Sequence, residues 1–210
     1  MILEDFRNTP FRMQDLSSVF PGCVNLAMKA KRLERDGLIM RLKKGLYVAS
    51  TKVSRMELST FLLANHIYGP SYVSMQTALR FYGLIPEAVY SVQSMTTGVA
   101  RDYENAIGTF NYIHVPADYY NVGVTMKEEN GASFMIATPE KALCDLMVYT
   151  PNLNLRFQTS VRNYLEEDIR FDMDELQDLD LTIIEECAKV AKKKIMLNQM
   201  VKFIKHERNI

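Results

Sequence analysis

The chain has 210 residues, of which 48% are hydrophobic and 24% are charged, and its 25 basic and 25 acidic side chains leave no formal net charge. These values are typical of a globular protein of one domain or two small ones, and they exclude a disordered chain. The apolar runs are too short to cross a membrane. The N-terminal residues MILEDFRNTPFR lack the apolar segment of a signal peptide.

The cysteines indicate the compartment. Cys23, Cys144 and Cys187 lie far apart and form no C-x-x-C pair. An odd number of widely spaced cysteines favours free thiols in a reducing cytoplasm. We therefore expect a soluble, cytoplasmic protein that has no membrane partner.

The charge is distributed unevenly along the chain. The first 55 residues carry eleven basic and five acidic side chains, a net charge of +6, whereas the remaining 155 carry 14 basic and 20 acidic ones, a net charge of −6. Net charge steers association rather than folding. A basic end joined to an acidic body therefore indicates a polyanionic partner, and we expect nucleic acid.

The basic end predicts two helices separated by a short turn. Residues 13–20 read as a short helix that ends at Pro21-Gly22, and residues 24–37 read as a second helix with Gly37 as its left-handed cap. At about 100° per residue, apolar side chains share one face of the second helix: Leu26, Ala30 and Leu33. The opposite face carries mostly cations: Asn25, Met28, Lys31, Arg32 and Arg35, with Lys29 beside them.

A β-hairpin is predicted directly after the second helix, with strands at 38–40 and 46–49 and a turn at 42–45. Two helices, a turn and a hairpin are typical of a winged helix-turn-helix, whose second helix enters the major groove of duplex DNA while the hairpin lies along phosphates. Base contacts specify and phosphate contacts position. Four residues are candidates for bases: Asn25, Met28, Lys29 and Arg32. Five are candidates for the backbone: Lys31, Arg35, Arg41, Lys43 and Lys44. For any single cation, the alternative is an ordinary solvated residue.

Three stretches in this order resemble the AbiEi family, antitoxins and transcriptional regulators of abortive-infection toxin–antitoxin systems. They are RLERDGLIMRLKKGLYV (32–48), SYVSMQTALRFYGLIP (71–86) and IATPEKALCDL (136–146). The resemblance implies an N-terminal domain that binds promoter DNA and represses its own operon. It also implies a larger C-terminal domain that is used to neutralise a nucleotidyltransferase-like toxin.

The class predicted for the whole chain is α+β, with a winged helix at 1–53 and a larger mixed domain at 54–210. Residues 50–53 read as a linker, and Ser54 with Glu57 fits a capping box that opens an apolar helix ending at Gly69-Pro70. Ser74 is expected to cap a helix that ends at Gly83. Four strands are expected, at 89–97, 110–115, 122–127 and 132–137. Thr138 and Pro139 then open a helix through Tyr149.

The body offers no established catalytic motif, since G-x-S-x-G, H-E-x-x-H, Walker and G-x-G-x-x-G patterns are absent from the sequence. T-P-E-K sets Glu140 beside Lys141, a pair that a metal-dependent nuclease could use, but helix capping explains the same residues. His114, in a strand-like run, reads as a sheet-face residue rather than a base. We therefore expect no enzyme, no cofactor and no metal. The alternative is a nucleic-acid-processing enzyme that uses the winged helix to bind substrate.

The last part of the chain combines an acidic run with a basic helix. Residues 166–186 contain ten acids and only Arg170 as a cation, which reads as a solvated surface or as a site for a cationic partner. One long helix is expected from about Thr182, with an apolar stripe opposite lysines that include Lys192–Lys194. Packing on its own domain is the preferred interpretation of this stripe. The alternative is docking to a partner protein or to a second copy that associates on DNA. Lys192–Lys194 are a candidate for a second DNA-contacting patch, and the alternative for these lysines is an ordinary solvated helix face.

Overall fold

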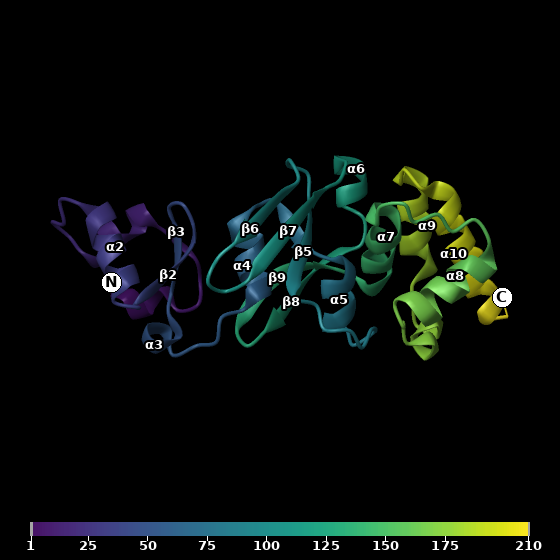
Figure 1. Cartoon of the computed structure of the whole chain (residues 1–210), viewed down its shortest axis with the longest axis horizontal. Helices are drawn as coiled ribbons and strands as arrows, with labels where there is room; N and C mark the ends of the chain where they lie inside the picture. Colours follow the sequence, from purple (N-terminus) through teal and green to yellow (C-terminus); the bar gives the residue numbers. More distant parts are fainter. Residues whose placement is uncertain (1, 210) are drawn as a thin grey trace.

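The computed structural model describes residues 2–209. It is a mixed α+β protein with two separate β-sheets. The molecule is elongated: a small N-terminal unit lies at one end, the larger sheet lies in the middle, and the C-terminal helices lie at the other end (Figure 1). Within residues 2–209, no helix has the length and apolar character needed to cross a membrane.

The N-terminal unit is built around α2 (Leu26–Arg35) and a small three-stranded antiparallel sheet of order β1-β3-β2. Its strands are β1 (Phe11–Arg12), β2 (Ile39–Lys43) and β3 (Leu46–Ala49). The short 3-10 helices η1 (Leu3–Phe6) and η2 (Met13–Asp15) and one turn of α-helix, α1 (Leu16–Val19), complete it. The apolar stripe of α2 packs into a core of six buried side chains: Phe11, Leu16, Ala30, Leu33, Ile39 and Tyr47.

The hairpin differs from its prediction at the turn. Strand β2 extends to Lys43, and the register shifts between Arg41 and Lys43, so the tip is reduced to Lys44 and Gly45. Gly45 has φ 79°, a left-handed conformation that favours glycine. One side of the hairpin is buried in the core of the larger body through Leu42, Leu46 and Val48. The hairpin therefore contributes to both cores, and the division at residues 53–54 stays a prediction.

The body contains a six-stranded mixed sheet of order β6-β7-β5-β4-β9-β8. The four predicted strands are confirmed as β5 (Ser91–Thr96), β7 (Thr109–His114), β8 (Val124–Glu129) and β9 (Ala132–Ala137). Two further strands were not predicted: β4 (Ser71–Val73) and β6 (Arg101–Glu104). β4 has only three residues, and β6 is a polar edge strand, so neither shows the apolar alternation of a half-buried strand.

Helices flank this sheet. Near the N-terminal unit are α3 (Thr51–Ser54) and α4 (Thr60–Ile67), and further along are α5 (Met75–Phe81), α6 (Ala117–Tyr120) and α7 (Pro139–Tyr149). Helix α7 lies between the sheet and the last group of helices (Figure 1). That group comprises α8 (Gln158–Asn163), the π-helix η3 (Tyr164–Asp168), the 3-10 helix η4 (Met173–Gln177), α9 (Leu181–Val190) and α10 (Lys194–Glu207).

The predicted capping box at Ser54 and Glu57 is wrong. Residues 51–54 form α3 instead of a linker, and Arg55 ends it with φ 55°. The apolar helix begins later, because Ser59 is its N-cap and accepts a hydrogen bond from the Leu62 backbone N–H at 3.2 Å. By contrast, the start of α7 is confirmed: Thr138 is the N-cap and Pro139 follows it.

The single long C-terminal helix is also wrong, because the chain forms α9 and α10 with a break at residues 191–193. Lys193 lies in the break, and its Nζ donates to the carbonyl oxygens of Thr150 (2.9 Å) and Leu153 (3.0 Å), just past the end of α7. Most of the predicted apolar stripe is buried, including Ile184, Leu197 and Ile204. The stripe therefore packs within the body, as the preferred interpretation expected.

Candidate nucleic-acid interface

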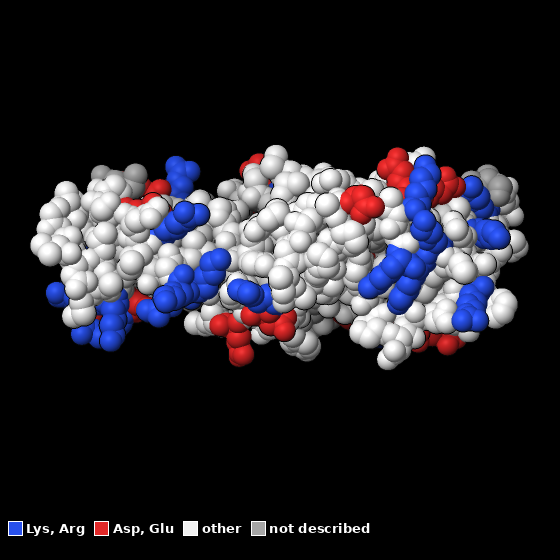
Figure 2. Space-filling view, turned by 90° about the horizontal axis from the view of Figure 1, so that it is seen from above, with Lys and Arg blue, Asp and Glu red and all other residues white. Residues whose placement is uncertain are grey.

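The outer face of α2 gathers six of the nine residues predicted to contact DNA. Lys31, Arg32 and Arg35 are exposed, and 66% of Met28 is exposed. They border a surface hollow of about 770 Å³ with seven lining residues: Cys23, Asn25, Met28, Lys29, Lys31, Arg32 and Arg35. The lining contains no acid, so this face is cationic with an apolar floor. Lysine and arginine side chains cluster over this end of the molecule (Figure 2).

Two of the predicted base contacts have local partners. Asn25 is the N-cap of α2, and its Oδ1 accepts a hydrogen bond from the Met28 backbone N–H at 3.0 Å. Asparagine directly before a helix is a capping signal that can be recognised in the sequence. The Lys29 Nζ lies 4.1 Å from the centroid of the Phe20 ring, a cation–π contact. Capping and ring contact account for these residues locally, and their contact with bases stays a prediction.

The arginines of this unit pair with neighbouring acids. Asp36 lies 3.7 Å from Arg32 and 3.2 Å from Arg35, while 70% and 72% of the two arginine side chains stay exposed. Exposed ion pairs contribute only about 0–1 kcal/mol, so phosphate oxygens can replace Asp36 at small cost. Arg41 on β2 pairs with Glu34 of α2 at 2.6 Å and is less exposed.

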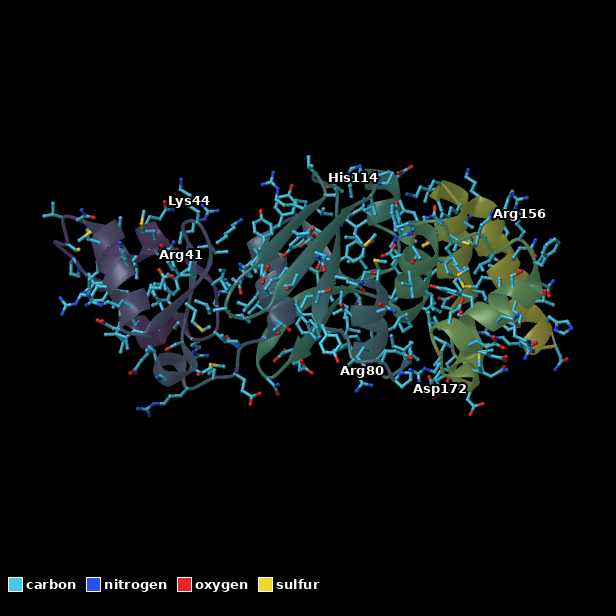
Figure 3. All side chains as sticks on the ribbon, in the orientation of Figure 1. Arg41, Lys44, Arg80, His114, Arg156 and Asp172 are labelled. Carbon is cyan, nitrogen blue, oxygen red and sulfur yellow. The ribbon has the colours of Figure 1, made fainter. Side chains whose placement is uncertain are left out.

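Lys43, a predicted phosphate contact, has local partners in this structure, and its contact with DNA stays a prediction. Its Nζ donates to the carbonyl oxygen of Ile67, at the end of α4, and lies 5.8 Å from the Tyr103 ring centroid. Beside it, the Asn105 side chain donates to the Leu42 carbonyl at 3.1 Å. Because β2 is longer than expected, Lys43 lies in the strand and faces the body. Lys44 remains exposed at the hairpin tip (Figure 3).

A polar network is buried between β4 and α7. The Lys141 Nζ lies 3.2 Å from Asp145 Oδ1, and both side chains are fully buried. Asp145 Oδ2 accepts hydrogen bonds from the Tyr72 hydroxyl (3.0 Å) and the Ser74 hydroxyl (2.6 Å). The Lys141 Nζ also donates to the Tyr119 carbonyl at 2.8 Å. A buried ion pair with several hydrogen bonds holds these elements in one arrangement.

Burial determines how these groups ionise. It raises the pKa of the Asp145 carboxyl, while the Lys141 ammonium and the Ser74 hydroxyl act in the opposite direction. Burial also raises the pKa of Tyr72 far above its ordinary value, and the nearby Asp145 charge adds to this shift. The charged form of Asp145 is thus stabilised in the core by one cation, Lys141, and by the hydroxyl groups of Tyr72 and Ser74.

Two of the three stretches that suggested a family meet in this network. Residues 71–86 supply Tyr72 and Ser74, and residues 136–146 supply Lys141 and Asp145. The spacing of Lys141 and Asp145, one helical turn apart, is the signal by which the pair could have been found. Tyr72, Ser74, Lys141 and Asp145 are buried together, so these side chains stabilise the fold and do not form a contact surface.

The two charged residues of the T-P-E-K sequence, Glu140 and Lys141, are closed to solvent. Glu140 is buried, and its Oε1 accepts a hydrogen bond from the Asp180 backbone N–H at 2.9 Å, while Lys141 is enclosed as described. His114 ends β7, where its Nδ1 lies 2.8 Å from the Gly98 carbonyl oxygen. Among residues 2–209, no three His, Cys, Asp or Glu side chains are grouped as metal ligands.

No protein-family model matches the chain, and no curated protein matches it in sequence.

Proposed function

We propose that this chain is a DNA-binding transcriptional regulator, an autorepressor whose N-terminal unit is a winged helix-turn-helix. The observation that carries the proposal is the outer face of α2, where three exposed cations and Met28 border a hollow without acids. In this proposal α2 enters the major groove, and Lys44 at the hairpin tip contacts the phosphate backbone. The whole chain has no net charge, so the cations gathered on the outer face of α2 form a local surface that is suited to a polyanion.

The body supports this surface by holding the hairpin. Lys43 bonds to Ile67, Asn105 bonds to the Leu42 carbonyl, and the apolar side of the hairpin is buried in the body. These contacts fix the direction of the hairpin relative to the six-stranded sheet, so DNA that touches Lys44 meets a preorganised element. A fragment ending near residue 55 would expose Leu42, Leu46 and Val48, and experiments should therefore use the full chain.

The proposal extends to an antitoxin role, which rests on the resemblance of the three stretches to the AbiEi family. In that role the body acts on a nucleotidyltransferase-like toxin. The acidic side chains between residues 166 and 186 are suited to the cationic site of a protein that handles nucleotides or nucleic acid, because opposed potentials raise the association rate.

The second candidate function, a metal-dependent nuclease, receives no support from the Glu140–Lys141 pair. Both side chains are buried and bonded within the body, so substrate cannot reach them in this arrangement. Incubating the chain with plasmid and with RNA in the presence of Mg²⁺ or Mn²⁺ separates the two functions. Cleavage that depends on the metal and on the chain would favour the enzyme.

The DNA-binding proposal predicts a specific salt dependence. If Lys31, Arg35, Arg41 and Lys44 each neutralise one phosphate, log affinity for promoter duplex should fall linearly with log salt, with a slope of roughly −4, because each contact releases condensed counterions. Fluorescence anisotropy of the full chain with labelled promoter duplex measures this slope. A folded chain with no affinity for duplex at low salt would contradict the proposal.

The antitoxin proposal predicts an effect of the acidic run. Replacing Asp172, Asp174, Glu175 and Asp178 by their amides should slow association with a nucleotidyltransferase-like toxin and make the rate less sensitive to salt, because long-range attraction is lost. Asp172 is part of this run (Figure 3). Surface plasmon resonance at two salt concentrations gives the rate. An unchanged association rate would place the toxin contact elsewhere or make neutralisation indirect.

A further inference from the structure

A second cationic surface lies at the opposite end of the molecule from α2. Where α9 ends and α10 begins, a surface hollow of about 750 Å³ has eight lining residues: Asn154, Arg156, Ala191, Lys192, Lys193, Lys194, Ile195 and Met196. Cationic side chains are prominent at this end as well (Figure 2). Arg156 lies far along the long axis from Arg41 and Lys44 (Figure 3). The two cationic surfaces are therefore separate.

The lysines of this C-terminal hollow have different roles. Lys193 is directed inward, where its Nζ bonds to carbonyl oxygens of the segment that follows α7. Burial and the neighbouring Lys192 both lower the pKa of Lys193. With Lys193 fixed in the break between the helices, Lys192 and Lys194 flank it as exposed residues. The fold thus places two lysines side by side at the surface.

The exposed cations of the hollow have no acidic partner. Within residues 2–209, neither Lys192, Lys194 nor Arg156 forms a salt bridge. Lys192 lies over the Tyr149 ring at 4.2 Å, and Arg156 Nε contacts only the Asn154 side chain, at 3.4 Å. The acidic residues of the run at 166–186 do not line the hollow. The lining of the hollow therefore contains cations and no acidic side chain.

Apolar side chains stand exposed beside these cations. Ile195 is 70% exposed on the hollow itself, and Phe157, next to Arg156 in the chain, is 68% exposed. An exposed aromatic ring beside unpaired cations is the combination by which proteins hold single-stranded nucleic acid: the cations track phosphates while bases stack on the ring. A guanidinium such as that of Arg156 also stacks on bases.

We infer that this hollow binds single-stranded nucleic acid, with phosphates on Arg156, Lys192 and Lys194 and a base on Phe157. The hollow is formed by the segment that contains Asn154 and Arg156 and by the junction between α9 and α10, a shape that a flexible polyanion can follow. A peptide strand adds to a free sheet edge, and no strand lines this hollow, which α7 separates from the six-stranded sheet (Figure 1). A strongly acidic peptide has the charge to contact the same cations, but the exposed Phe157 ring favours a partner that carries bases. This inference does not depend on the proposed promoter binding by α2.

The test compares two triple variants of the full chain. In the first, Arg156, Lys192 and Lys194 become glutamine; in the second, the matched control, three exposed lysines that line neither hollow, Lys52, Lys127 and Lys202, become glutamine. Binding of a fluorescent oligouridylate and of promoter duplex is measured by anisotropy over a range of salt. For three phosphate contacts on a single strand, the log–log salt slope is about −2. The first variant should bring this slope close to zero and weaken oligouridylate binding at least about tenfold, whereas the control should leave it unchanged.

Phe157→Ala provides an independent measurement, with an expected loss of about fivefold or more in oligouridylate affinity and an unchanged salt slope, because stacking carries no charge. Circular dichroism checks that every variant is folded. No oligouridylate binding by the wild-type chain, or equal losses in the two triple variants, would overturn the inference. Loss of duplex binding alone in the first variant would also overturn it. Competition by polyglutamate as effective as that by unlabelled oligonucleotide would overturn it too, because it would identify an acidic protein segment as the partner.

Discussion

Replacing Lys141 by methionine is expected to destabilise the chain by about 3–5 kcal/mol, the usual cost of removing one partner from a buried ion pair. Methionine matches the length of the lysine stem but supplies no charge, so Asp145 stays in the core with two hydroxyl donors and no cation. Burial already raises the pKa of Asp145, and Lys141 is the main group opposing that shift. Urea unfolding followed by circular dichroism measures the change.

Two controls make this prediction specific. Lys202→Met removes an exposed lysine from α10 and should change stability by less than about 0.5 kcal/mol. The double variant Lys141→Met with Asp145→Leu removes both charges and should recover much of the loss, because it leaves no buried charge uncompensated. A Lys141→Met chain as stable as Lys202→Met would show that the pair does not hold β4 and α7 together.

Local signals predicted much of the fold. Gly37, Pro139 and Gly69-Pro70 mark helix ends through backbone conformation alone, and the structure places helix boundaries at or beside all three. Apolar runs predicted strands at 110–115 and 132–137, and the structure has β7 (Thr109–His114) and β9 (Ala132–Ala137) there. These features depend on a few neighbouring residues, so a single sequence carries them.

Features that depend on distant partners were missed. The break before α10 requires Lys193 to meet carbonyl oxygens 40 residues or more away, and nothing in the lysine run distinguishes Lys193 from its neighbours. Lys43 and Lys44 are adjacent and look alike in the sequence, yet Lys43 follows a register shift in β2 and its Nζ is bonded to the Ile67 carbonyl oxygen. The exposed face of the single helix α2 could therefore be predicted from the sequence, whereas the contact between hairpin and body could not.

The last prediction separates base reading from backbone contact on promoter DNA. Arg32→Ala should weaken binding to the specific promoter site by roughly 1–3 kcal/mol if its guanidinium reads a guanine edge, and should change binding to random duplex little. Arg32 suits this role because 70% of its side chain is exposed on the outer face of α2, and the one ion pair that it forms within residues 2–209, with Asp36, is long at 3.7 Å.

Lys44→Ala should behave differently. At the exposed hairpin tip a lysine can reach phosphates but carries no sequence information, so the variant should weaken specific and random duplex about equally and reduce the salt slope by about one. Lys43→Ala is the matched control at the neighbouring position. It should leave the salt slope unchanged, because the Nζ of Lys43 donates to the Ile67 carbonyl oxygen and is not free to contact DNA. Anisotropy with both duplexes over a range of salt distinguishes the three variants. Equal losses on both duplexes for Arg32→Ala would make Arg32 a phosphate contact, and a reduced slope for Lys43→Ala would mean that the hairpin leaves the body when DNA binds.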